Sequence, residues 1–209
     1  MGRGLCLLAV LATVAADPSA PRIGLLFRFE HEPDPNFLQQ VRNDFEMIFR
    51  SSGLSFHWKL NAPGAPEVCD ELVRVQMRGR CEVQLFENQS EPQPEPMLGW
   101  TMLDHGAVVP YLVVDCDRIA GFLKSLPLIR RGGSPQWLPA LYARLAARVL
   151  AHELLHVLLR TTEHRDSELA GEKLKPSDLF FDARLHPAEA AALGRIYAGA
   201  ACRPQSKDD

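Results

Sequence analysis

Hydrophobic and polar positions along the chain predict strands in the first half and mainly helices in the second. Short apolar runs and period-two alternation, bounded by turn residues, predict strands. The expected strands are Ile23–Phe29, Leu54–Leu60, Leu72–Met77, Cys81–Phe86, Leu98–Leu103 and Ala107–Asp115. Apolar residues at helical spacing predict helices from Pro35 to the Ser51-Ser52-Gly53 stop, and at about Asp117–Leu126, Pro139–Arg160 and Pro187–Ala200. This order indicates an α+β fold.

Two proline-containing segments refine this prediction. Pro110 lies inside the expected strand Ala107–Asp115, and because proline cannot donate to a sheet ladder, we expect this strand at a sheet edge. The segment at about 87–97 is acidic and rich in proline, which is typical of an exposed connection. The chain has no internal repeat, and we expect residues 17–209 to form a single domain.

The first 16 residues have the features of a secretory signal peptide. Arg3 precedes an apolar run from Leu5 to Ala16, and Asp17-Pro18 ends that run abruptly. Cleavage near Ala16 would export the mature chain, to the periplasm or as a secreted protein. No later apolar stretch reaches transmembrane length, so we expect no stable membrane insertion after cleavage.

Export changes the interpretation of the cysteines. Cys6 would leave with the signal peptide, and an even number would remain in an oxidising compartment, which favours two disulfides over free thiols. The remaining cysteines are Cys69, Cys81, Cys116 and Cys202. Four cysteines allow three disulfide connectivities, and the pair closest in sequence, Cys69 with Cys81, is the expected local disulfide.

Composition and charge exclude several classes of protein. Of 209 residues, 46% are hydrophobic and 23% charged, which excludes collagen-like and wholly disordered chains. The formal net charge is −3, and no dense basic block extends beyond Arg130-Arg131, so nucleic acid is not an expected partner. No nucleophile-elbow, P-loop or dinucleotide-binding glycine motif is present.

The strongest predicted helix carries His152-Glu-Leu-Leu-His156, which matches H-E-x-x-H. Residues four apart share a helix face, so both imidazoles can reach one Zn²⁺, while Glu153 is placed to take a proton from an activated water. From Val149 to Leu159, eight of eleven residues are apolar and surround the helix, which predicts burial. Buried imidazoles and a buried carboxylate need compensation, and a metal ion would supply it.

A catalytic zinc normally has three protein ligands. His164 follows His156 by eight residues, and in a continuous helix it would lie about 12 Å away. It can bind the same ion only if the helix ends near Arg160 and the chain turns back, which Thr161-Thr162 favours. His164 is the preferred third ligand because imidazole suits zinc, and a carboxylate from Glu163, Asp166, Glu168 or Glu172 could take its place. The remaining histidines lack ligand spacing and are expected to be surface or structural residues: His31, His57, His105 and His186.

The segment 151–164, followed by Ser177-Asp-Leu179, resembles zincin-like, metzincin-related bacterial proteins of the metallopeptidase type. These proteins carry a third histidine eight residues after the second, and weaker similarity covers 98–101 and 113–118. The resemblance implies a zincin-like mixed sheet whose edge strand packs beside a buried active-site helix. It also implies His152, His156 and His164 as zinc ligands and Glu153 as general base. Unlike metzincins, the chain has Leu159 at the helix-ending glycine position and no methionine after Met102.

The sequence therefore predicts an exported zinc metallopeptidase that acts on a peptide or protein substrate. The competing hypothesis is a non-catalytic exported protein with a structural zinc, or with a buried helix that binds no metal. The donor that would stabilise an oxyanion is not identified by any motif, and Tyr197, Arg184 and His186 are candidates. We also expect an extended substrate to pair with the edge strand Ala107–Asp115.

Overall fold

The computed structural model describes residues 20–60, 69–82, 97–130, 136–164, 169, 179 and 182–198. The expected signal peptide, Cys202, residues 83–86 of an expected strand and nearly all of the proline-rich connection lie outside these residues. The strands are β1 (Arg22–Phe29), β2 (Ser55–Leu60), β3 (Glu71–Arg78), β4 (Gly99–Asp104) and β5 (Ala107–Asp115). The helices are α1 (Pro35–Phe49), a 3-10 turn η1 (Arg50–Ser52), α2 (Cys116–Ser125), α3 (Pro127–Arg130), α4 (Leu138–Leu159) and α5 (Pro187–Tyr197).

The strands form one mixed sheet in the order β2-β1-β3-β5-β4. β2, β1, β3 and β5 are parallel, and β4 pairs antiparallel with β5 as a hairpin. In the hairpin turn, His105 and Gly106 have positive φ angles of 49° and 82°, as a tight two-residue turn requires. The prediction of a mixed sheet combined with helices is confirmed. The sequence predicted the strands of the first half but not that most of them would pair in parallel.

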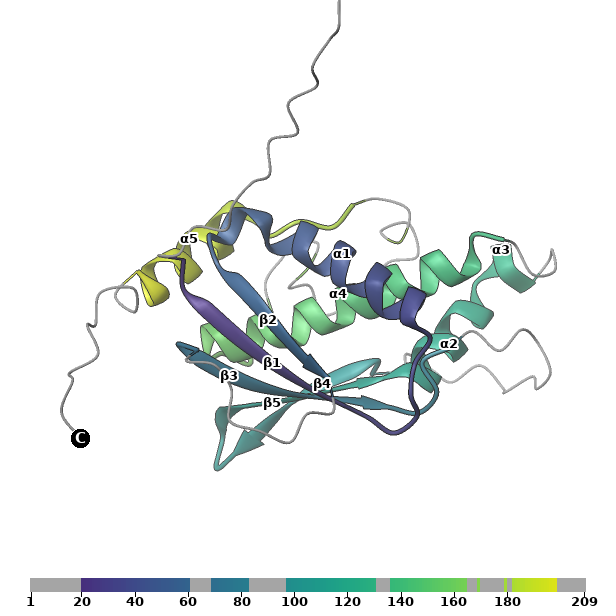
Figure 1. Cartoon of the computed structure of the whole chain (residues 1–209), viewed down its shortest axis with the longest axis horizontal. Coiled ribbons are helices and arrows are strands. Elements are labelled where there is room, and N and C mark those ends of the chain that lie inside the picture. Colours follow the sequence, from purple (N-terminus) through teal and green to yellow (C-terminus); the bar gives the residue numbers. More distant parts are fainter. Residues whose placement is uncertain are drawn as a thin grey trace, which may run out of the picture.

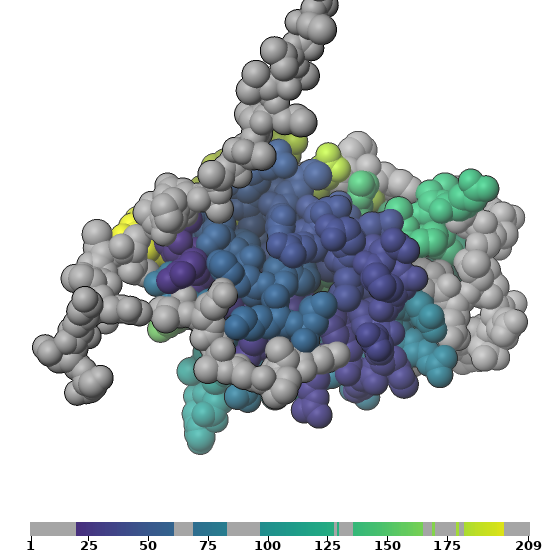
Figure 2. Space-filling model, viewed as in Figure 1, coloured from purple at the N-terminus to yellow at the C-terminus, as the bar shows by residue number. Residues whose placement is uncertain are grey.

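The helices α1 and α4 pack against each other beside the sheet (Figure 1). α1 begins at Pro35, as predicted, and Asp34 caps it: its carboxylate accepts hydrogen bonds from the backbone N–H groups of Asn36 and Phe37. Its Phe45 packs against the rings of β2. In the space-filling view, α1 and β2 cover the middle of one face and hide most of α4 (Figure 2).

α4 is the central helix, and its observed range differs from the predicted one by a single residue at each end. Most of its side chains are buried, because it contacts α1, α2, β4 and β5. Among the described helices, none combines the length and apolar character needed to cross a bilayer.

The predicted edge position of Ala107–Asp115 is wrong. β5 lies between β3 and β4, and β4 is the edge strand beside α4. The parallel pairing of β5 with β3 begins only at Tyr111, and the pairing with β4 shifts register between Thr101 and Leu103. Pro110 therefore comes before the parallel ladder with β3 begins, and it lies opposite the register shift in β4. At this point in the strand no ladder hydrogen bond requires its missing N–H.

The predicted disulfide between Cys69 and Cys81 is also wrong, because Cys81 pairs with Cys116. β3 and β5 are adjacent and parallel, and Arg78 at the end of one is level with Asp115 at the end of the other. The cysteines just beyond these two ends therefore meet. Cys69 precedes β3, at the opposite end of the sheet.

Candidate metal centre

His152 and His156 lie one turn apart on α4, and their imidazoles point toward the same space. The two Nε2 atoms are 3.2 Å apart, and the rings meet edge to face with centroids separated by 4.7 Å. The predicted pairing of the two motif histidines on one helix face is therefore confirmed.

A sharp turn at the end of α4 returns the chain toward these histidines. Arg160 has a left-handed backbone with φ 52° and ψ 44°. Its N–H donates to the carbonyl of Val157, and the N–H of Thr161 donates to the carbonyl of His156. This is the Schellman pattern that usually ends on glycine, here with an arginine at the left-handed position. The helix thus ends at Leu159, one residue before the end predicted from the polar segment that follows.

The returning chain brings His164 to the other two imidazoles. Its ring centroid lies 5.3 Å from that of His152 and 4.9 Å from that of His156. Ligand nitrogens of the three histidines lie within 4.8 Å of one another, so together they could hold a metal ion. Among the carboxylates predicted as substitutes for His164, Glu163 is exposed beside this cluster. Asp166, Glu168 and Glu172 lie outside the described residues.

Backbone carbonyls fix the orientation and the protonation of two of these rings. The Nδ1 of His152 lies 2.6 Å from the carbonyl oxygen of Leu169, and the Nδ1 of His156 lies 2.8 Å from that of Thr161. A carbonyl can only accept, so each Nδ1 carries the proton and each Nε2 of the neutral ring has a free lone pair. Two lone pairs then face each other across 3.2 Å.

This arrangement fits a metal ion. Tetrahedral zinc with Zn–N bonds of 2.0–2.1 Å places its nitrogen ligands about 3.3 Å apart. Two facing lone pairs repel unless a cation lies between them, and the observed separation of 3.2 Å leaves room for zinc bonded to both. The donor set and its spacing therefore match zinc chemistry.

Burial keeps these imidazoles neutral. Desolvation lowers the pKa of His152, opposed by the hydrogen bond to Leu169. Desolvation likewise lowers the pKa of His156, opposed by the hydrogen bond to Thr161. Metal ligation requires the neutral ring, so both residues are in the ligating form near neutral pH.

Glu153 points to a different side of α4, toward the edge strand β4. Its Oε2 lies 2.9 Å from the hydroxyl of Thr101, and its Oε1 lies 4.0 Å from the Nε2 of His152. Burial raises the pKa of this carboxyl, and the hydrogen bond from Thr101 partly opposes the shift. A carboxylate with a raised pKa beside a metal position is suited to accept a proton.

Thr101 was not predicted as a functional residue. The signal that could have found it is Gly99, two positions earlier in the same strand, since glycine inside a strand often marks a close backbone approach. A Cβ on Gly99 would lie 2.6 Å from Cγ1 of Val149 and 3.1 Å from Cγ of Glu153. The edge strand can therefore approach α4 closely only because position 99 is glycine.

A small hollow borders the histidine cluster. It is lined by His152, Leu155, His156, Leu159, Thr161, Glu163 and Glu189. Glu189 is almost completely buried and accepts a hydrogen bond from the backbone N–H of His186, which caps α5. Glu163 and His164 are exposed, so the cluster is accessible from solvent on this side.

The residues predicted as candidate oxyanion donors do not line this hollow. The hydroxyl of Tyr197 donates to a carboxylate oxygen of Glu71. Burial is the larger cause that raises the pKa of Tyr197, and this hydrogen bond raises it further. His186 caps α5, and Arg184 is exposed. None of these three residues belongs to the described histidine cluster, nor do His31, His57 and His105.

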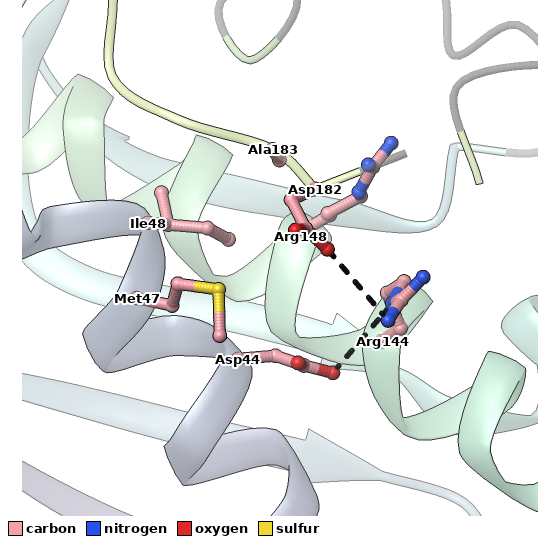
Figure 3. Close-up of a pocket in the computed structure, with 7 residues that line it drawn as sticks. All are labelled: Asp44, Met47, Ile48, Arg144, Arg148, Asp182 and Ala183. Atoms are coloured by element: carbon pink, nitrogen blue, oxygen red, sulfur yellow. Dashed lines mark ion pairs between the residues drawn. The ribbon is translucent and has the colours of Figure 1, made fainter. Parts of the chain in front are cut away.

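A second polar hollow lies against the first half of α4 (Figure 3). Arg144 lies between two carboxylates, with nitrogen–oxygen distances of 4.0 Å to Asp44 and 3.8 Å to Asp182. Arg148, one turn further along the helix, is also buried beside this hollow. The ion pairs of Arg144 connect α1, α4 and the segment that precedes α5.

No protein-family model matches the chain, and no curated protein is similar to it in sequence. Among solved structures, archaemetzincin from Methanopyrus kandleri is similar in shape, with a TM-score of 0.49 and 12% sequence identity. The match covers 87% of this chain and 97% of the archaemetzincin chain. The chemistry of the site is therefore inferred from its own side chains.

Proposed function

We propose that this chain is an exported, zinc-dependent metallopeptidase in which His152, His156 and His164 hold the metal and Glu153 is the general base. The observation that carries the proposal is the pair of Nε2 atoms at 3.2 Å, on rings whose Nδ1 atoms each contact a backbone carbonyl, with a third imidazole and a buried carboxylate beside them. A purely structural zinc would need the imidazoles but not the carboxylate.

Each residue has a distinct part in this proposal. When bound, zinc supplies Lewis-acid chemistry, which acidifies water and polarises a carbonyl. The carbonyls of Leu169 and Thr161 keep two ligand rings in the correct tautomer. Glu153 accepts the proton of the attacking water and can return it to the leaving amine.

A peptide is the substrate that the surrounding fold favours. β4 has only β5 as a partner in the described sheet, and it runs directly beside Glu153. An extended peptide could pair with this free edge through main-chain hydrogen bonds. This replaces β5 with β4 as the strand that would receive the substrate.

Two features support export. The N-terminal residues have the pattern of a signal peptide, and the buried disulfide between Cys81 and Cys116 is the kind of bond that persists in oxidising compartments. A test of location is the N-terminal sequence of protein recovered from outside the cytoplasm of an expressing cell. Export predicts a chain that begins near Asp17, and an intact Met1 would contradict it.

The activity is tested by incubating the zinc-loaded protein with a mixture of unrelated peptides and identifying new termini by mass spectrometry. Chelation should abolish cleavage, and zinc should restore it. Zinc-loaded protein that leaves every peptide intact would contradict the proposed activity.

A further inference from the structure

The edge strand contacts the proposed base through one side chain. The hydroxyl oxygen of Thr101 lies 2.9 Å from Oε2 of Glu153 and 2.9 Å from its backbone carbonyl oxygen. A hydroxyl has one proton, and both neighbours are acceptors, so Thr101 donates to this residue whichever oxygen it selects. The bond to an ionised carboxylate is the stronger of the two.

This contact gives the two carboxylate oxygens of Glu153 different surroundings. Oε2 is held by the strand, and Oε1 lies on the side of the ligand His152, 4.0 Å from its Nε2. A glutamate side chain has three rotatable bonds, so it has several orientations of similar energy unless a partner selects one. Thr101 selects the orientation in which Oε1 is available beside the metal position.

The strand is built so that this contact can form. Gly99 allows close approach, because a Cβ there would lie 2.9 Å from the carbonyl oxygen of Val113 as well as against Val149. The regular pairing of β4 with β5 extends from Gly99 to Thr101, and the register shifts immediately afterwards. The Gly-Trp-Thr segment therefore fixes the height and direction of the Thr101 hydroxyl over α4.

We propose that Thr101 is a positioning residue, whose hydroxyl orients Glu153 so that its other carboxylate oxygen, Oε1, faces the three-histidine cluster. This inference rests on the proposed peptidase function. It adds a specific requirement for a hydroxyl group on the edge strand, separate from the metal ligands and from the base itself.

The test compares two substitutions that each remove one part of the threonine side chain. Thr101→Val keeps the shape and removes the hydroxyl, whereas Thr101→Ser keeps the hydroxyl and removes the methyl group. Misorientation of a catalytic group can cost about 100-fold in rate. We expect Thr101→Val to lower kcat about 10- to 100-fold, with KM and zinc content close to wild type. Thr101→Ser should retain kcat within about threefold of wild type, because the hydroxyl remains.

Two controls separate positioning from folding. Ser51→Ala removes a hydroxyl from an exposed serine outside the histidine cluster and should leave kcat unchanged. Melting temperatures of all variants identify any loss that comes from unfolding. Equal losses in Thr101→Val and Thr101→Ser would indicate a packing role and overturn the inference.

A structural measurement keeps the inference testable apart from activity. In crystal structures of the zinc-loaded proteins, Glu153 should keep one orientation in wild type and Thr101→Ser and should change or spread in Thr101→Val. An unchanged Glu153 in Thr101→Val, or an unchanged kcat in that variant, would overturn the positioning role. Absence of cleavage by wild type would instead contradict the proposed function, while the crystal structures would still decide the role of Thr101.

Discussion

Two polar clusters lie along one stripe of α4, and their polar side chains are compensated in different ways. The stripe is formed by Arg144, Arg148, His152 and His156, each four residues after the previous one. The first half places a guanidinium between Asp44 and Asp182. The second half gathers three imidazoles.

The difference lies in whether the chain itself provides the compensating charge. Around Arg144, opposite charges come from α1 and from the segment before α5, so the described cluster is balanced without any ligand. Around His152, the ring nitrogens that face one another are both acceptors. Helix spacing alone therefore does not distinguish the two clusters; the acceptor atoms that face each other at His152 and His156 do.

The largest effect on activity should come from replacing Glu153, the carboxylate beside the histidine cluster. Glu153→Gln removes the proton acceptor but no metal ligand, so we expect peptide hydrolysis to fall about 10²- to 10⁴-fold while zinc content stays unchanged. Initial rates and metal analysis on the same preparation check this. Glu163→Gln, an exposed carboxylate beside the same cluster, is the matched control and should keep both properties. A similar loss of activity in both variants would contradict the assignment of the base.

Removing a proposed ligand should abolish the stabilisation by zinc, which we expect only of the histidine cluster. We expect His156→Ala to lose zinc, because two ligands remain and the buried groups lose their compensation. If the site binds zinc as proposed, zinc at about 1,000 times its Kd should stabilise the wild type by about 4 kcal/mol, and this increment should disappear in His156→Ala. Thermal unfolding with zinc and with chelator measures it. Full zinc content in His156→Ala would refute this residue as a ligand.

Breaking the arginine cluster should lower the stability of the protein without changing its response to zinc. Arg144→Met removes the central charge and leaves Asp44 and Asp182 without their shared partner. These side chains are partly exposed, so we expect a loss of about 1 kcal/mol in the free energy of unfolding. The stabilisation by zinc should remain at its wild-type size. A loss of zinc binding in Arg144→Met would show that the two clusters are not independent.

The smallest effect concerns the pH dependence of the arginine cluster. Burial, the largest cause, raises the pKa of Asp44, opposed by the charge of Arg144. A carboxyl whose folded pKa is raised contributes stability at low pH that is lost as the pH rises through that pKa. Wild type should therefore lose stability relative to Asp44→Asn from about pH 4 upward, by less than about 1 kcal/mol. Denaturant unfolding at several pH values measures this, and the opposite slope would contradict it.

The sequence was most informative where local chemistry decides structure. The apolar surroundings of the H-E-x-x-H motif predicted the burial of α4, and the polar residues after Leu159 predicted its end. The return of His164 followed from the same segment. The left-handed conformation of Arg160 was not predictable, because this position usually needs glycine and is stabilised here by the turn around it.

The errors arose where contacts between distant segments decide structure. Pro110 indicated an edge strand, but the register of β5 against two neighbours places this proline outside the parallel ladder. Cys81 and Cys116 meet because two parallel strands end side by side, which spacing along the chain does not reveal. Thr101 was missed for the same reason, since its partner is 52 residues away in sequence.

The most direct test of the central claim is the zinc content of the protein purified without chelators, measured by elemental analysis beside the His164→Ala variant. His164 is the proposed ligand whose position depends on the fold rather than on the helix motif. The three-histidine site predicts about one equivalent of zinc in the wild type and a clear loss in His164→Ala. Less than about half an equivalent in the wild type, or full zinc in His164→Ala, would contradict a site built from these three histidines.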